Sequence, residues 1–148
     1  MTENNVILVD KQDNAIGAME KMEAHIKAVL HRAISVFIVN SQGQWLLQQR
    51  TFDKYHSKGL WTNTCCSHPF PGETSLEAGN RRLMEEMGMK AEVREIFSFM
   101  YIQELENGLT EHEFDHVFVG VSDDLPQPHP EEVMDYKYVS FDELKADV

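Results

Sequence analysis

The stretch from Trp61 to Met89 constrains the fold more than any other part of this chain. A short extended run leads through a turn rich in proline and glycine into a helix predicted over residues 73–88. Apolar residues recur along this helix at helical spacing and are expected to face the core: Leu76, Leu83 and Met87, with Gly79 on the same stripe. Thr74 or Ser75 can cap the start of the helix, and Gly88 occupies the position of a C-cap glycine.

The extended run before the helix carries a thiol and an imidazole on one side. Residues two apart in a strand point to the same face, so Cys66 and His68 are predicted to face one way and Cys65 the other. An intracellular cysteine is most often a small buried hydrophobe, and Cys65 is interpreted in that way. The polar neighbours of Cys66 and the charged helix that follows favour a functional thiol, and we interpret this region as the active centre.

Length and charge limit the class of protein. The 148 residues are predicted to form one domain, residues 1–148, with a core of its own. No apolar run is long enough to cross a membrane, and the first residues lack the pattern of a signal peptide, which indicates a cytoplasmic protein. The net charge of −12 argues against a nucleic-acid partner but not against a small phosphorylated ligand held by local cations. Neighbouring cysteines rarely pair, so a disulfide scaffold is not expected.

Apolar and alternating patterns predict a mixed sheet. Strands are expected at residues 5–9, 34–39, 45–50, 91–105, 109–121 and 136–139. Residues 10–17 and 51–59 are predicted as loops, 20–30 as a helical turn or irregular entry segment, and 140–143 as a capping box that starts a helix. Turn signals at residues 40–43 and 106–108 predict two hairpins. Strands with one central helix favour an α/β fold in which helices flank a mixed sheet.

Two glutamates on one strand indicate a metal site. Glu111 and Glu113 share a face of an otherwise apolar strand, where two carboxylates are unfavourable unless they are paired or bind a metal. Of the seven histidines, three are candidate ligands, although spacing alone does not select them: His25, His31 and His68. The other four are interpreted as surface or turn residues: His56, His112, His116 and His129. On the predicted helix, carboxylates beside arginines are typical of a magnesium–diphosphate platform.

That helix resembles the Nudix box, G-x5-E-x7-R-E-U-x-E-E-x-G-U, in which U is apolar. Anchored on Gly88, the matching positions are Ser67, Glu73, Arg81, Arg82, Leu83, Glu85, Glu86, Gly88 and Met89. Ser67 replaces the first glycine, and Arg82 replaces a glutamate where Nudix hydrolases gather catalytic metal. Further motifs are Trp61-Thr62-Asn63, Cys66-x-His68-Pro69, Glu111-x-Glu113 and Glu131-Glu132-Val133-Met134-Asp135-Tyr136. Together they resemble the type I isopentenyl-diphosphate Delta-isomerases of the Nudix superfamily, from about Val6 to the end of the chain.

This resemblance implies a Nudix-like fold and a metal-dependent enzyme of isoprenoid biosynthesis, which moves a double bond between isopentenyl and dimethylallyl diphosphate. The implied ligands of one divalent ion, Mn²⁺ or Zn²⁺, are His25, His31, His68, Glu111 and Glu113. Glu86 matches the ligand of a Mg²⁺ ion that accompanies the diphosphate, and the implied diphosphate-binding cations are Lys21, Arg50, Lys54 and Arg82. Cys66 and Glu113 match the acid/base pair, and Tyr101 matches an assisting tyrosine. Family members usually continue into a C-terminal helical segment with a tryptophan, which this sequence is expected to lack.

Two other functions remain open at this point. A Nudix-type diphosphate hydrolase would place its metal on Glu73, Glu85 and Glu86 and would not need Cys66. A non-catalytic, metal-stabilised binding module would need neither the thiol nor a substrate. The sequence leaves the oligomeric state undetermined.

Overall fold

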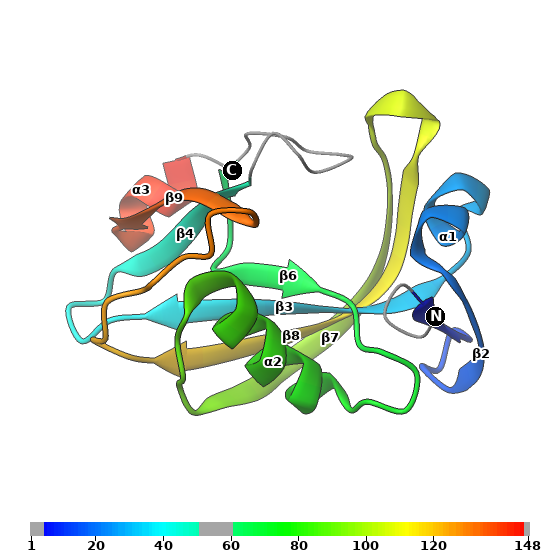
Figure 1. The fold of residues 1–148 in the computed structure, drawn as a ribbon, viewed down its shortest axis with the longest axis horizontal. Helices are drawn as coiled ribbons and strands as arrows, with labels where there is room; N and C mark the ends of the chain where they lie inside the picture. The colour runs from blue at the N-terminus through cyan, green and yellow to red at the C-terminus, as the bar shows by residue number, and fades with distance from the viewer. Residues whose placement is uncertain (1–4, 51–60, 147–148) are drawn as a thin grey trace.

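The computed structural model describes residues 5–50 and 61–146, in which helices lie against a mixed sheet (Figure 1). The nine strands of this part are β1 (Asn5–Val9), β2 (Ala15–Glu20), β3 (His31–Val39), β4 (Trp45–Arg50), β5 (Trp61–Thr62), β6 (Cys65–Ser67), β7 (Val93–Glu104), β8 (Thr110–Val121) and β9 (Val133–Val139). The helices are α1 (Lys21–Lys27), α2 (Ser75–Met87) and α3 (Phe141–Ala146), with a 3-10 turn, η2, at Glu106–Gly108. The predicted α/β class is confirmed.

Strand β3 is the centre of the sheet. It runs parallel to β8, from the pair His31 and Glu113 to the pair Val39 and Val121, and antiparallel to β6 on its other side. Because side chains alternate along a strand, one face of these three strands packs against α2 and the other does not. We call this second face the site face and define it by His31, Ser35, Cys66, Glu113 and Asp115.

Helix α2 is the predicted helix, with both caps in place. The Thr74 side chain accepts a hydrogen bond from the Glu77 N–H and the Glu77 carboxylate accepts one from the Thr74 N–H, which forms a capping box. Gly88 ends the helix at φ 61°, and a Cβ there would lie 2.5 Å from the Gln127 carbonyl oxygen. The helix buries Leu83 and Met87 as predicted, and the Gly79 position lies against Val36 of β3.

The predicted stripe is wrong at Leu76, which is 45% exposed. Leu76 belongs to the first turn of α2 and lines an open cavity beside Val93 and Phe118, so none of the described elements closes over it. The helix reaches the core through later turns. Its buried partners there come from several strands: Ile34, Val36, Ile38, Leu46, Cys65, Val93, Phe118 and Val133.

The hairpin predicted between residues 34–39 and 45–50 exists only at its turn. The single register pair joining β3 and β4 is Val39 with Trp45, after which the strands part. Strand β4 then pairs along its length with β9 and near its end with β5, while β3 pairs with β6 and β8. The second predicted hairpin is confirmed: β7 and β8 pair through η2, where Asn107 has φ 62° and Gly108 has φ 72°. This hairpin extends beyond the rest of the sheet beside α1 (Figure 1).

Several boundaries differ from those predicted. The loop expected at residues 10–17 is shorter, because Asp10 accepts hydrogen bonds from the Gln12 and Asn14 N–H groups and turns the chain directly into β2. Strand β3 begins at His31 and β9 at Val133, both earlier than expected. The capping box at Ser140 and Glu143 is confirmed at the start of α3, whereas the loop predicted at 51–59 lies outside the described residues. None of the described helices combines the length and the apolar character that a membrane crossing needs.

Candidate active site

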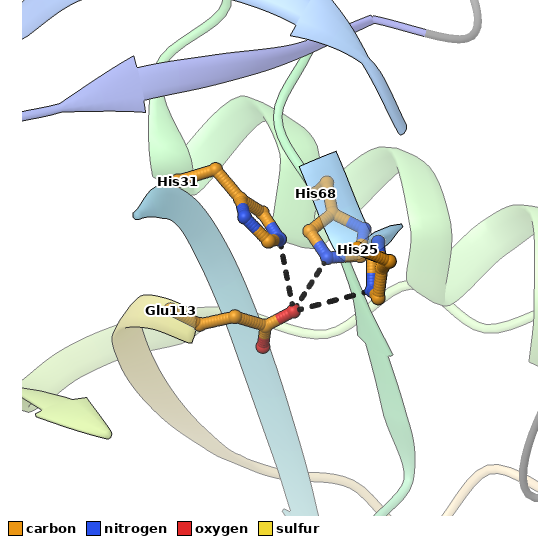
Figure 2. Close-up of side chains that lie close together, drawn as sticks. All are labelled: His25, His31, His68 and Glu113. Atoms are coloured by element: carbon orange, nitrogen blue, oxygen red, sulfur yellow. Dashed lines mark hydrogen bonds and ion pairs between the residues drawn. The ribbon is translucent and has the colours of Figure 1, made fainter. Parts of the chain in front are cut away.

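Four side chains from separate segments meet at one end of the site face. His25 comes from α1, His31 from the start of β3, His68 from the turn after β6 and Glu113 from β8. Their ligand atoms lie within 4.8 Å of one another. Figure 2 shows the three imidazoles converging on the Oε2 oxygen of Glu113, at Nε2–Oε2 distances of 4.0 Å for His25, 3.1 Å for His31 and 2.9 Å for His68.

The hydrogen bonds around this cluster fit a bound cation. Nδ1 of His25 donates to the Lys21 carbonyl oxygen and Nδ1 of His31 donates to the Val29 carbonyl oxygen, each at 2.8 Å. In the neutral tautomer that these bonds select, Nε2 carries a lone pair and turns it toward the Glu113 carboxylate. Lone pairs on nitrogen and oxygen that face one another at this distance repel unless a positive ion lies among them. Nδ1 bonding of this kind is also the usual support of a metal-ligating histidine.

Burial favours the protonation states that bind metal. It lowers the pKa of His25, and it lowers the pKa of His68 to about 4. Burial alone would raise the pKa of Glu113, but the neighbouring His68 and His31 hold that pKa well below its ordinary value. Near neutral pH His25 and His68 therefore offer neutral imidazoles and Glu113 an ionised carboxylate, which are the forms that coordinate a divalent ion.

The second oxygen of Glu113 has a different partner. The Tyr101 hydroxyl donates a hydrogen bond to Glu113 Oε1 at 2.5 Å, from the position on β7 directly across from Glu113. Burial and the Glu113 charge raise the pKa of Tyr101, so its hydroxyl keeps its proton. The Tyr101 ring stacks on Phe99, which in turn contacts Phe97. Glu113 can therefore face the histidines with one oxygen and exchange a proton with the other.

The two cysteines lie as the alternation predicts. Cys65 is fully buried in the core beneath α2, and Cys66 is half-buried on the site face. Burial raises the pKa of Cys66 to about 12, and the charges of Glu86, Glu113 and Glu111 act in the same direction. Cys66 is therefore a neutral thiol at physiological pH, within electrostatic reach of Glu113.

Glu86 is the centre of a buried charge network. This carboxylate is 3% exposed and accepts hydrogen bonds from the Gln48 amide at 3.0 Å and from Arg82 Nε at 3.2 Å. Arg82 also reaches Glu85 and Glu132. Burial lowers the pKa of Arg82, but Glu86 and Glu132 more than reverse this effect and raise the pKa. A carboxylate held beside a fixed guanidinium suits a metal–diphosphate pair.

A cavity of about 410 Å³ connects this network to the histidine cluster. Basic side chains line it together with His68: Lys21, Arg81 and Arg82. Two of the four predicted diphosphate-binding cations, Lys21 and Arg82, thus face the same space. Arg50 ends β4, its Nε is buried without a hydrogen-bond partner in the described part of the chain, and its charge reaches Cys66. Lys54 lies outside the described residues.

Glu111 lies outside the four-residue cluster. Burial and the Glu113 charge raise its pKa to about 7, so the two carboxylates are within electrostatic reach of each other. Its role as a metal ligand therefore remains a prediction.

Among the remaining histidines, His116 is not the surface residue that we expected. It is half-buried, and its ring nitrogens lie 2.7 Å from Asp13 and 2.9 Å from Glu95. His112 is half-buried as well and bonds the Ala28 carbonyl oxygen, whereas His129 is exposed as expected and His56 lies outside the described residues. Alternation along β8 puts His112 and His116 on the face opposite Glu113. Alternation alone does not predict whether that face is exposed to solvent or covered by other residues.

The sequence interpretation overlooked three polar residues at the site. Gln48 is 1% exposed and bonds Glu86, Asp115 is 6% exposed, and Ser35 donates a hydrogen bond to Asp115. A polar residue inside an apolar run was the available signal in each case. Uncompensated polar groups rarely occupy such positions.

Comparison with known proteins defines the class first. The NUDIX domain family matches residues 29–148. The fold is similar to that of DR0079 from Deinococcus radiodurans, with a TM-score of 0.77 at 21% identity over 97% of this chain and 87% of that one. A MutT protein from Methanosarcina mazei is also similar, with a TM-score of 0.68 at 20% identity over 79% of this chain and 81% of that one. The site thus belongs to a Nudix fold.

The sequence relatives are more specific. The isopentenyl-diphosphate Delta-isomerase of Pectobacterium atrosepticum is 57% identical over 94% of this chain and 78% of its own length. Isopentenyl-diphosphate Delta-isomerase 2 of Aromatoleum aromaticum is 52% identical over 99% of this chain and 77% of its own length. The chain belongs to the isopentenyl-diphosphate Delta-isomerase family.

Proposed function

We propose that this protein isomerises isopentenyl diphosphate to dimethylallyl diphosphate by moving a proton onto one carbon of the alkene and another proton off its neighbour. The observation that carries the proposal is the arrangement at Glu113, with Oε2 toward three histidines and Oε1 bonded to Tyr101, within electrostatic reach of the neutral Cys66 thiol. An unactivated alkene needs proton donors and acceptors that are held in place and shielded from water. The identity with named isomerases supports the same assignment.

In this proposal Cys66 and Glu113 handle the two proton transfers, and Tyr101 assists. Cys66 carries a proton at neutral pH, as a donor must, while Glu113 is ionised and accepts the Tyr101 hydrogen bond. The Tyr101 hydroxyl lowers the energy of the carboxylate and keeps its Oε1 oxygen in a fixed direction. The stacked rings of Phe99 and Tyr101 supply an apolar, electron-rich wall of the kind that a tertiary carbocation requires.

We infer two metal sites with different tasks. His25, His31, His68 and Glu113 would hold an Mn²⁺ or Zn²⁺ ion, to which Glu111 would add a further oxygen. Glu86 would hold an Mg²⁺ ion against the diphosphate, whose oxygens would also meet Lys21, Arg50, Lys54 and Arg82. Such ions supply positive charge that neutralises ligand oxygens and fixes their geometry. Residues 1–148 acting as one catalytic domain, and a cytoplasmic location, remain predictions from the sequence.

The deciding experiment incubates the protein with isopentenyl diphosphate and Mg²⁺ and follows dimethylallyl diphosphate and free phosphate together. We expect the isomer without phosphate release. Cys66→Ala should lower the rate by about 100-fold or more, the usual contribution of a proton-transferring group. The matched control, Cys65→Ala, removes the neighbouring thiol from the core face and should keep most of the activity. Phosphate or diphosphate release would instead identify a hydrolase, and no turnover with intact metal binding would favour a binding module.

A further inference from the structure

A row of three side chains crosses three neighbouring strands on the site face. Cys66 of β6 is the direct register partner of Ser35 of β3, and Asp115 lies on β8 beside β3. Directly opposed residues in antiparallel strands have Cβ atoms about 4.5–5.5 Å apart, on the same face of the sheet. Ser35 and Cys66 thus project from neighbouring positions of the site face. The core side chains Ile34, Val36 and Cys65 point the other way.

Ser35 is tied to Asp115 by a short hydrogen bond. Its Oγ donates to Asp115 Oδ2 at 2.7 Å, and Asp115 is 6% exposed. The other carboxylate oxygen, Oδ1, is buried without a hydrogen-bond partner in the described part of the chain. A buried carboxylate with one unpaired oxygen is unfavourable for stability, and an apolar pair would join β3 and β8 at least as well. Stability alone therefore does not account for this pair.

We propose that Ser35 and Asp115 are positioning residues that fix the direction of the Cys66 thiol proton. A hydroxyl has one proton to donate, and Ser35 donates its proton to Asp115. The Ser35 oxygen can therefore only accept hydrogen bonds from its other neighbours. The acceptor draws the Cys66 S–H toward one orientation and prevents Ser35 from donating to the sulfur. The inference rests on the proposed function, in which Cys66 transfers a proton to or from the substrate.

The direction of the Ser35–Asp115 hydrogen bond can be reversed without changing its shape. Asp115→Asn keeps the size of the side chain but adds an N–H that can donate to Ser35, which frees the Ser35 proton to turn toward Cys66. Ser35→Ala removes the hydroxyl, whereas Ser35→Thr retains it and serves as the conservative rescue. Ser41 and Asp123 form the matched control, since Ser41 Oγ donates to Asp123 Oδ1 at 2.9 Å on an exposed turn.

The experiment measures kcat and KM for isopentenyl diphosphate with Mg²⁺, together with the metal content and melting temperature of each variant. Ser35→Ala and Asp115→Asn should lower kcat by about 10- to 100-fold, at the lower end of the range for proton-transfer groups, with KM changed by less than about twofold. Ser35→Thr should regain most of the activity. Ser41→Ala and Asp123→Asn should leave kcat unchanged.

A second readout uses the metal-free protein. The rate at which iodoacetamide modifies Cys66, mapped by mass spectrometry, should rise several-fold in Asp115→Asn at constant pH, because Ser35 could then donate to the thiolate. Unchanged kcat and alkylation in Ser35→Ala and Asp115→Asn would overturn the inference, as would a loss of kcat that Ser35→Thr does not restore. An inactive wild-type protein, or an active Cys66→Ala variant, would instead refute the proposed function. The alkylation rates would still test whether Ser35 and Asp115 act on the Cys66 thiol.

Discussion

Each carboxylate oxygen of Glu113 has its own set of partners, and substitutions at the two ends should therefore have different effects. Tyr101→Phe removes the hydroxyl that bonds Oε1 but leaves the histidines around Oε2 and the ring stack on Phe99. We expect kcat to fall by about 10- to 100-fold. Metal content, measured by mass spectrometry of the dialysed protein, should stay at the wild-type level.

The comparison variant is Glu113→Gln, which keeps the size of the side chain but loses its charge. We expect it to lose the metal and the activity together, because one of the four cluster residues can no longer act as an anionic ligand. Parallel losses of metal in Tyr101→Phe would show that the two oxygens are not independent.

Among single residues, the sequence predicts the position of some site residues well and of others poorly. The direction of Cys66 follows from strand alternation, which is local, whereas His68 lies one residue beyond the end of β6. His25 and His31 meet only because Ala28 takes a left-handed conformation, φ 56°, and turns α1 back toward β3. Their spacing carries no sign of that turn, and resemblance to a family was needed to choose them. The pairing of Ser35 with Asp115 depends on strands far apart in the chain.

Among the elements, α2 connects the sheet to the charge network, and its two ends differ in packing. Leu83→Ala removes a side chain that is 1% exposed and should destabilise the protein by about 2–5 kcal/mol. Leu76→Ala, the matched change in the open first turn, should cost about 1 kcal/mol or less. Urea denaturation of both variants measures the difference, and equal losses would mean that the cavity beside Leu76 closes in solution.

Local signals predicted elements better than their partners. The Asn-Gly turn, the N-cap at Thr74 and the capping box at Ser140 and Glu143 act within a few residues, and all three appear where expected. The parallel pairing of β3 with β8 joins residues that are remote in the sequence. On the other edge of β3, β6 pairs with residues 34–36, where β4 would continue the hairpin that its turn suggests. Hydrophobic patterning identifies a strand but not its neighbour.

For the whole molecule, the cluster predicts an unusual dependence of metal binding on pH. Two histidines with ordinary pKa values would together reduce metal affinity by about 100-fold between pH 7.5 and 5.5, because protons compete for their nitrogens. Burial lowers the pKa of His68 to about 4, so this imidazole stays unprotonated in this range, and burial lowers the pKa of His25 as well. The loss of affinity should be much smaller than 100-fold.

Titration calorimetry of the metal-free protein with Mn²⁺ or Zn²⁺ at the two pH values tests this prediction. His129→Ala changes an exposed histidine and should leave the pH dependence as it is. A full 100-fold loss in the wild type would show that the two buried imidazoles titrate like exposed ones.

The cluster also has a consequence for folding. Its members come from α1, β3, the turn after β6 and β8, so an ion bound to them would close two long loops of the chain, from His31 to His68 and from His68 to Glu113, and one short one. Both cysteines are unpaired and adjacent in sequence, which leaves this chain without a covalent crosslink between distant segments. Metal coordination can take over that task, because it favours the compact state by the free energy of binding and needs no oxidising environment. The ion would then act as a reversible staple, and the amount of free metal around the protein would help to decide how long it stays folded.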